Sequence, residues 1–317
     1  MKINLLKKSF LFLTTSLIYA DTVSLVLEND VIVWQDHHYT NGMYFTWMSD
    51  NNTTFPDLLS FIDLKQKNVA FSISHAIFTP ENKNISTRDL NDLPYAGYVA
   101  LNFLAYKSSA NFFHEAGINI GMVGPFAQAD TLQKNFHSVF GFNEPNGWDN
   151  QLDDEFIYGI SYNAGYKTDP IKIQDLSLDL TTNMKVDLGN FYTGTLVGTS
   201  LRLSSIAMRS FITAGNFIGA NETSVLNYEP TKSFNWALSL GIHYNRFNTY
   251  YLIDKAIEEG YHLYELDYII GQKFALDLYY NALKVSFYLK SVDIQTKSIP
   301  SSSNEKTGGV SIVWKWD

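Results

Sequence analysis

The feature that most constrains this sequence is a strict two-residue alternation of apolar and polar side chains. From residue 175 to 188 the chain reads DLSLDLTTNMKVDL, in which every odd position is polar and every even position except Thr182 is apolar. Successive side chains of a β-strand point to opposite faces, so this period predicts a strand with one apolar face and one polar face. The same alternation recurs in residues 236–244, 283–289 and 310–316. The sequence therefore predicts an all-β fold.

The length of these segments distinguishes a membrane barrel from a soluble sandwich, because both produce alternation. The segments run roughly 10 to 15 residues, whereas globular strands average about 5–6 and a tilted membrane strand needs about 9–11. Many begin or end in aromatic residues, such as Tyr39, Trp47, Tyr166 and Trp316, as the interfacial girdles of membrane barrels do. We therefore expect a membrane β-barrel rather than a soluble sandwich.

The expected fold class is a closed antiparallel transmembrane β-barrel of about 12 strands, with short helices in its connecting loops. The sheet must close, because hydrocarbon offers no hydrogen-bond partner to an open edge. An even number of strands suits such closure. The expected strands lie near residues 22–29, 40–49, 66–77, 95–107, 110–122, 155–167, 173–188, 192–206, 233–248, 263–275, 279–294 and 306–316.

The first 20 residues have the pattern of a bacterial secretory signal. They carry Lys2, Lys7 and Lys8, then a short apolar stretch, then Ala20 before a polar residue. The stretch is too short to remain as a membrane anchor. We therefore expect residues 1–20 to be a signal peptide and residues 21–317 to form the barrel domain.

Composition excludes several classes of function. Without the three lysines of the signal, 20 basic residues stand against 32 acidic ones, a net charge of −12. A chain this acidic repels phosphate overall, so nucleic acid is not an expected partner. The absence of cysteine excludes a disulfide, a thiol nucleophile and a thiolate metal site.

The connection after the first expected strand is rich in polar residues. It lies within LENDVIVWQDHHYTNG and offers Asn29 and Asp30 before it and Thr40 after it. If the chain begins on the periplasmic side, the connections after the odd-numbered strands face outward. A polar loop is the simplest interpretation of this stretch, and half of an active site at the outer rim is the alternative.

Two further outward connections add a lysine, a glutamine and a histidine. The connection after the third strand, FTPENKNISTRDLNDLPYAG, contains Lys83 and Arg88, for which solvated charge is the default interpretation. The connection after the fifth strand contains DTLQKNFHSVFG, a predicted short helix that places Gln133 and His137 on one flank. A lone histidine is usually structural. The features that predict this helix are Asp130 as N-cap, Gln133 as its capping-box partner, an apolar stripe of Leu132, Phe136, Val139 and Phe140, and Gly141 at its end.

Together these groups have the parts for metal-assisted hydrolysis. Asp30 supplies a hard oxygen ligand of the kind that Ca²⁺ prefers, and a neutral His137 can take a proton from water. Zinc is not expected, because there is no cysteine and the histidines are scattered. The sequence also lacks the G-x-S-x-G and H-E-x-x-H motifs of other hydrolases.

The motifs resemble, in order and context, those of the outer-membrane lipid A deacylase family of the 3'-O-deacylase type. The resemblance is carried by END followed by DHHYTNG, by FTPEN followed by LPYAG, and by VGP, LQKNFH and EPNGWDNQLDDE. It is dense from about residue 21 to 166 and faint beyond. It implies a twelve-stranded outer-membrane barrel with a Ca²⁺-dependent site at the outer rim that removes the 3'-linked acyloxyacyl group of lipid A.

The resemblance also assigns roles to individual residues. It implies Asn29 and Asp30 as the family's Asn-Asp pair, with Asp30 as a metal ligand, and Thr40 as its hydroxyl group. It implies His137 as the base and Gln133 as the glutamine one turn before it. Either Lys83 or Arg88 fills the basic position. The implied partners are lipid A and the surrounding outer-membrane lipids, and no protein partner is implied.

Two other functions stay open at this point. One is a non-enzymatic outer-membrane barrel, a porin or surface-binding protein. The other is an esterase that acts on phospholipids.

Overall fold

The computed structural model describes residues 22–33, 38–50, 57, 59–215, 230–265, 267–292 and 305–316. The expected signal peptide, residues 1–20, lies outside the described residues. The strands are β1 (Thr22–Asn29), β2 (His38–Met48), β3 (Gln66–Thr79), β4 (Ala96–Ser108), β5 (Phe112–Val123), β6 (Glu155–Lys167), β7 (Ile171–Ile173), β8 (Leu176–Gly189), β9 (Tyr192–Ser204), β10 (Thr231–Tyr250), β11 (Tyr268–Asn281), β12 (Leu283–Val292) and β13 (Glu305–Lys315). The helices are η1 (Asp30–Val33), η2 (Pro125–Ala127), α2 (Ala129–Phe140), η3 (Trp148–Asn150) and α3 (Tyr251–Glu258).

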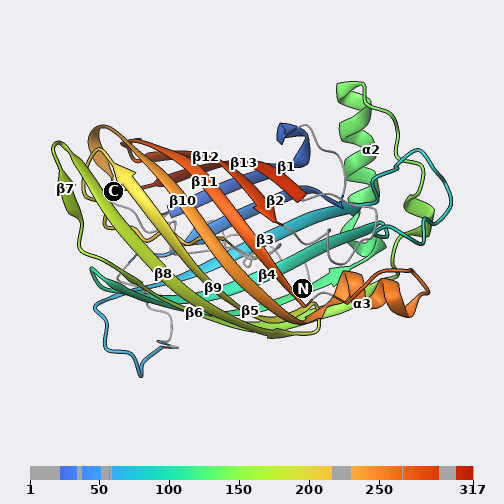
Figure 1. Cartoon of the computed structure of the whole chain (residues 1–317), viewed down its shortest axis with the longest axis horizontal. Coiled ribbons are helices and arrows are strands. Elements are labelled where there is room, and N and C mark those ends of the chain that lie inside the picture. Colours follow the sequence, from blue (N-terminus) through green and yellow to red (C-terminus); the bar gives the residue numbers. More distant parts are fainter. Residues whose placement is uncertain are drawn as a thin grey trace, which may run out of the picture.

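Twelve of these strands close into an antiparallel barrel, as the sequence predicts (Figure 1). Each strand pairs with its neighbour in the chain, β1 pairs with β13, and β6 pairs with β8 across the remaining gap. The short β7 pairs only with β8 and lies outside this ring. Within the described parts of the chain, no helix is long and apolar enough to span a bilayer.

The expected bounds of the β11–β12 hairpin are wrong. The sequence predicts a break after residue 275, but β11 continues to Asn281, and β12 begins at Leu283. The alternation continues through this region without a run of glycine, proline or polar residues. The turn depends on Asn281, whose φ of 50° is a left-handed conformation that asparagine tolerates better than most residues.

The two faces of the barrel wall differ in polarity in the sense that a membrane barrel requires. Large apolar side chains such as Leu25, Phe45 and Ile73 are exposed on the outer face. Their inward neighbours, such as Ser24 and Thr46, are buried in the interior. A soluble barrel would place the apolar set inside, so this arrangement indicates that lipid surrounds the wall.

Protein fills the interior at the end of the barrel where the chain enters β1. Arg202 is fully buried and makes two hydrogen bonds to Asp179, of 3.0 and 3.1 Å, and a third to the carbonyl of Ser210 at 2.9 Å. A Cβ built on Gly241 of β10 would lie 2.7 Å from the Cα of Ala214. The segment after β9 therefore runs inside the wall instead of forming a simple turn.

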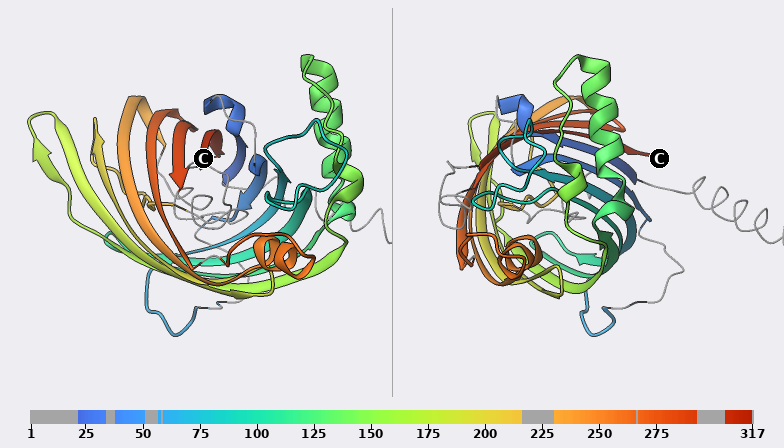
Figure 2. Two further views of the ribbon diagram at one scale, coloured as in Figure 1. Left: turned by 45° about the vertical axis from the view of Figure 1, so that its right-hand side comes forward. Right: turned by 90° about the vertical axis from the view of Figure 1, so that its right-hand side faces the viewer.

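Helices and loops gather at the opposite end, which we call the α2 rim (Figure 2). It is formed by η1, residues 80–95, η2, α2 and α3. There α3 packs Leu252, Ile253 and Ala256 into a buried cluster of aromatic and aliphatic side chains inside the barrel mouth. The connections after β1, β3 and β5, which their parity places at one end of the barrel, all reach this rim.

The two faces of the wall should differ in how well they tolerate an introduced arginine, and two adjacent residues of β5 test this. Ile118 points outward and is half exposed, between Phe103 and Ile160 of the neighbouring strands, whereas Asn119 points inward. We expect Ile118→Arg to lower the free energy of unfolding by ~2–4 kcal/mol, because it places a charge in lipid near the middle of the strand. Asn119→Arg should lower the free energy of unfolding by less, because Asn119 points inward and its cross-strand neighbours are Asn102 and a glycine. Urea unfolding in vesicles measures both, and equal losses would contradict the assignment of the two faces.

Candidate active site

The helix α2 packs against the outer face of the barrel wall. A Cβ built on Gly97, an outward position of β4, would lie 2.8 Å from the Cβ of Ala129 and 2.9 Å from that of Ala127. His75 of β3 donates a 2.9 Å hydrogen bond from Nε2 to the carbonyl of Ala127. Ile77, Tyr95, Ala129 and Trp148 then form a buried cluster between helix and wall. The outward face of β3 and β4 at this rim is thus covered by protein.

The expected start of α2 is wrong. Its N-cap is Gln128, with a left-handed φ of 55°, and Asp130 lies within the first turn and makes no capping bond. The Asp130–Gln133 capping box therefore does not form. Gly141 ends the helix as predicted, with a φ of 73° and its N–H donated to the carbonyl of His137.

The buried face of α2 carries polar side chains instead of the apolar stripe. Gln133 and His137 are both buried, one turn apart. The Oε1 atom of Gln133 accepts a 2.8 Å bond from the indole N–H of Trp148. The Nδ1 atom of His137 lies 2.5 Å from the carbonyl oxygen of Asn143. Because a carbonyl only accepts, Nδ1 must carry the proton, and in the neutral ring the lone pair is on Nε2.

A β-bulge turns Thr40 towards the outer face. In the β2–β3 register Tyr39 lies opposite Phe78 and Asn41 lies opposite Ile77, so Thr40 is an inserted residue. Its hydroxyl lies 2.7 Å from that of Thr79, which is on the outward face of β3. Bulges commonly redirect a side chain beside an active site. Both hydroxyls are buried next to the region that α2 covers.

Asn29 and Asp30 approach the same face from the neighbouring strand. Asn29 lies opposite Asn41 in the β1–β2 register, and it shares the outward face of β1 with Leu25 and Leu27. Asp30 begins η1 and is fully buried. Asn29 therefore lies on the outer side of the wall, and Asp30 follows it directly in the chain. Residues 34–37 of that connection lie outside the described residues.

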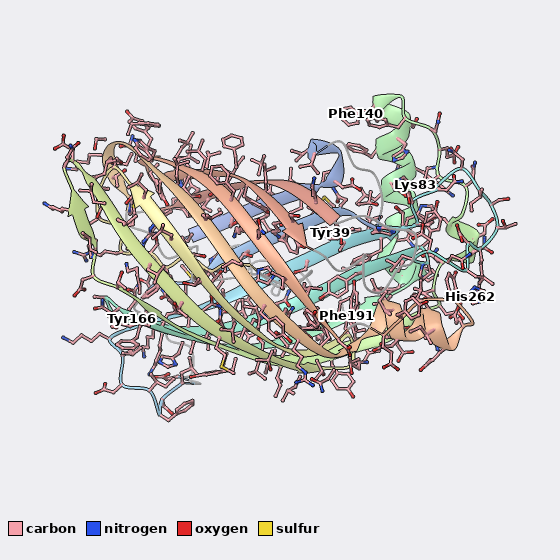
Figure 3. The ribbon with its side chains drawn as sticks, viewed as in Figure 1. Tyr39, Lys83, Phe140, Tyr166, Phe191 and His262 are labelled. Atoms are coloured by element: carbon pink, nitrogen blue, oxygen red, sulfur yellow. The ribbon has the colours of Figure 1, made fainter. Side chains whose placement is uncertain are left out.

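The two candidate basic residues lie in different places. Lys83 is buried, and its carbonyl accepts a 2.9 Å bond from the N–H of Asn146 in the segment that follows α2. Figure 3 shows Lys83 beside α2. Arg88 is half exposed and forms a 3.1 Å ion pair with Glu259, at the end of α3. The geometry brings Lys83, and not Arg88, to the α2 side of the rim.

A buried histidine–carboxylate pair, which was not predicted, lies next to Thr79. His38 Nε2 lies 2.7 Å from Asp92 Oδ1, and His38 has a left-handed φ of 61°. Burial alone would raise the pKa of the Asp92 carboxyl. The hydrogen bond and charge of His38, with N–H groups of Glu81 and Leu93, outweigh burial and lower this pKa. The available signal was the position of His38 and Asp92 in DHHYTNG and just before LPYAG.

A second unpredicted network holds the lumen side of the same strands. Glu28 is buried and accepts bonds from the hydroxyls of Tyr39, at 2.6 Å, and Tyr288, at 2.7 Å. Lys290 also forms an ion pair with Glu28. The N–H of Tyr39 donates to Glu305 at 2.8 Å. These bonds tie the ends of β1, β2, β12 and β13 together behind Thr40.

The donor groups near Asp30 are oxygen atoms. Asp30 offers a buried carboxylate, Asn29 beside it in the chain offers an amide oxygen, and Thr40, next to Asn29's strand partner Asn41, offers a hydroxyl oxygen. No group of three or more His, Cys, Asp or Glu residues with metal-binding geometry occurs within the described ranges. The donors fit a hard cation that takes most of its ligands from neutral oxygens, and they do not fit zinc.

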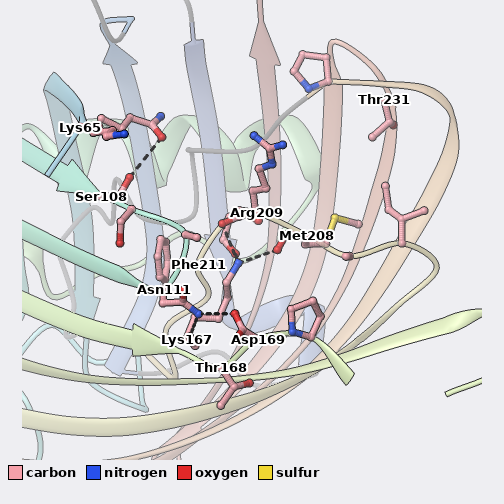
Figure 4. A pocket seen from close by; sticks show the side chains of 18 of the residues that line it. Lys65, Ser108, Asn111, Lys167, Thr168, Asp169, Met208, Arg209, Phe211 and Thr231 are labelled. Carbon is pink, nitrogen blue, oxygen red and sulfur yellow. Dashed lines mark hydrogen bonds between the residues drawn. The ribbon is translucent and has the colours of Figure 1, made fainter. Parts of the chain in front are cut away.

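A cavity of about 750 Å³ lies at the other end of the barrel (Figure 4). It is lined by residues including Lys65, Ser108, Lys167 and Arg209. Lys167 donates its ammonium hydrogens to the carbonyls of Met208 and Arg209, at 2.7 and 2.9 Å. The cavity is far from α2 along the barrel, and Lys167 in its lining is hydrogen-bonded to the interior segment. The α2 rim is the better candidate site, because the predicted chemistry-bearing groups gather there.

Displacing α2 should open this site without breaking the barrel. Gly97→Leu places a side chain where Ala127 and Ala129 now pack, so we expect α2 to leave the wall and the segment after it to become accessible to protease. Val99→Leu adds bulk on the same face two residues further from the rim and is the matched control. Limited proteolysis of both variants in detergent measures the effect. Equal resistance of the Gly97→Leu and parent proteins would contradict the close packing of α2.

The comparisons with known proteins identify the family and the fold. The family model described as outer membrane protein LpxR matches residues 6–316. The solved structure of LpxR from Salmonella typhimurium superposes with a TM-score of 0.74 at 13% identity, covering 93% of this chain and 100% of that one, a likeness that shows the fold.

Two other solved barrels match with lower TM-scores. The β domain of the Bordetella autotransporter BrkA gives a TM-score of 0.46 at 7% identity, over 94% of this chain and 100% of that one. A KdgM porin gives 0.41 at 7% identity, over 93% and 99%. No curated protein matches significantly. The family match over nearly the whole chain confirms the resemblance found in the motifs: this chain belongs to the LpxR family of outer membrane proteins.

Proposed function

We propose that this protein is a lipid A 3'-O-deacylase, which hydrolyses the 3'-linked acyloxyacyl ester of lipid A at the outer face of the outer membrane. Membership of the LpxR family supports a lipid A substrate. The location of the candidate site supports it independently, because Thr40, Gln133 and His137 lie on the lipid side of the wall and not in the lumen. A substrate embedded in the outer leaflet reaches such a site without entering the barrel.

The observation that carries the proposal is the hydrogen bond between His137 and Asn143. It fixes the ring tautomer and leaves Nε2 to accept a proton, which is what a general base needs. Nε2 of His137 takes a proton from water as the water oxygen attacks the ester carbonyl carbon. The bond between the carbonyl carbon and the 3' oxygen of the sugar then breaks, that oxygen takes the proton from His137, and the acyloxyacyl chain is released as a free acid.

The other residues orient and stabilise this reaction. The Gln133–Trp148 bond holds the helical turn that precedes His137. The hydroxyl of Thr40 and the amide of Asn29 can bind the ester oxygens. The net charge of the chain is strongly negative, but Lys83 supplies a local positive charge. This charge would attract the phosphates of lipid A and stabilise the developing oxyanion.

Asp30 would hold Ca²⁺, with neutral oxygens from its neighbours and from the substrate completing the set. The bound ion would polarise the ester carbonyl, an electrostatic effect that can be worth several kcal/mol of barrier. The burial of Asp30 suits this role, because a charge held away from water acts more strongly on the reacting group.

Replacing His137 should remove activity and leave the barrel folded. We expect His137→Ala to lower the deacylation rate by ~10²–10⁴, the usual cost of losing a general base. His137→Gln, similar in shape but unable to take the proton, should be nearly as inactive. Each variant is expressed in a strain with intact lipid A, folding is checked by heat-modifiable migration, and lipid A is analysed by mass spectrometry.

Two other histidines are matched controls for this experiment. His262 lies at the same rim, against Asn91, and His114 lies in β5 with its Nδ1 2.6 Å from the Tyr162 hydroxyl. His262→Ala and His114→Ala should keep most of the activity. A folded His137→Ala protein that deacylates at the parent rate would refute the base assignment. Unmodified lipid A with the parent protein would favour a non-enzymatic barrel, and fatty acid released from vesicles without lipid A would favour a phospholipid esterase.

Calcium removal gives an independent prediction. Activity of purified protein on lipid A should disappear with excess chelator and return with Ca²⁺, whereas Zn²⁺ should restore little, because the donors are hard oxygens. Asp30→Asn should reproduce the effect of the chelator at ordinary Ca²⁺ concentrations. Undiminished hydrolysis in excess chelator would exclude the ion from the mechanism.

A further inference from the structure

One flank of α2 exposes its apolar side chains. Leu132, Phe136, Val139 and Phe140 form the stripe that the sequence predicts, but none of them is buried, and Val139 and Phe140 are 78% and 63% exposed. Phe136 contacts Phe140 and Phe142, with ring centroids 4.5 and 6.2 Å apart. An aromatic patch of this kind is unusual on a water-facing surface.

The opposite flank of the same helix is polar. Thr131, Lys134, Asn135 and Ser138 recur at intervals of three and four residues, so they form a second stripe. The buried face with Gln133 and His137 lies between the two stripes. The helix therefore has three faces: one against the barrel wall, one apolar and one polar.

The direction of α2 determines what these flanks meet. The barrel axis runs horizontally in Figure 1, and α2 runs across it, so the helix lies roughly parallel to the plane of the membrane. In the end-on view of Figure 2 it extends past the outline of the barrel. Figure 3 shows Phe140 near the far end of α2, on the side turned towards the strands. The apolar flank thus continues the outer surface of β3 and β4, the strands that α2 contacts, on which Ile73 and Leu101 are exposed.

We infer that the apolar flank of α2 is immersed in the acyl chains of the outer leaflet, with the polar flank in the headgroup layer. A helix with an apolar and a polar face lying in the plane of a membrane is the arrangement of interfacial amphipathic helices. The apolar flank is continuous with the lipid-facing wall, and this continuity identifies lipid, and not another protein, as its partner. The immersion does not depend on the proposed hydrolysis.

Immersion would also set the depth of the candidate site. His137 lies between the two flanks, so it is held at the boundary between headgroups and acyl chains, the level at which ester bonds of a lipid lie. The helix would then fix the depth of His137 in the membrane, at the layer in which the ester bonds of the substrate lie.

The absence of cysteine allows a direct test by site-directed spin labelling. Val139→Cys and the adjacent Ser138→Cys are labelled with a nitroxide in the mature protein, reconstituted into phosphatidylcholine–phosphatidylglycerol vesicles without lipid A. Leu101→Cys, on the outer wall, is the lipid reference, and Thr87→Cys, in the exposed 80–95 loop, is the water reference. Collision with oxygen, which concentrates in lipid, is compared with collision with a water-soluble nickel chelate.

We expect the oxygen-to-nickel collision ratio at Val139→Cys to approach that of Leu101→Cys, and the ratio at Ser138→Cys to approach that of Thr87→Cys. Equal, water-like ratios at both sites of α2 would overturn the inference. Protection of Val139→Cys from both reagents, with spin–spin broadening that grows with protein density, would show that a second copy covers the flank and would also overturn it. Because no substrate or Ca²⁺ is present, neither outcome bears on the proposed hydrolysis.

Discussion

The structure depends on one constraint: in hydrocarbon, every backbone N–H and C=O must find its partner within the protein. The sheet meets this constraint by closing through the β1–β13 and β6–β8 pairs. Closure fixes the register of every strand, and register fixes which side chains face lipid. The positions of Thr40, Asn29 and Thr79 on one outer surface are consequences of that register and of the single inserted residue in β2.

The candidate site occupies the place where the lipid-facing pattern is interrupted. Along β3 the outward positions change from exposed Phe71 and Ile73 to His75, Ile77 and Thr79, which are covered. Polar groups at these positions would be costly in lipid, and α2 shields them. Gly97 makes this possible by letting the helix approach the backbone of β4. The outer face of the wall is mostly apolar, but at its rim it carries a strip of polar side chains that α2 shields from lipid.

Most of the fold could be predicted from the sequence, because strand alternation is local and repeats in every segment. The rim cluster could be predicted from parity, since odd-numbered connections reach the same end. Several features could not be, and three of them show why. The turn at Asn281 lacks an apolar-to-polar break, the His38–Asp92 pair joins residues 54 positions apart, and Lys83 and Arg88 are indistinguishable until α2 and α3 are in place.

Which face of α2 is buried depends on the medium around the protein, and the helical pattern alone does not reveal that medium. In a water-soluble protein the stripe containing Phe136 and Phe140 would pack inward and His137 would be a flank residue. Beside a membrane the apolar surroundings are outside the protein, so the buried contacts can be made by Gln133 and His137. The proposed general base would thereby lie in a site with protein on one side and lipid on the other. Both exclude bulk water, so interactions that stabilise the proposed oxyanion would weaken less there than in an open loop.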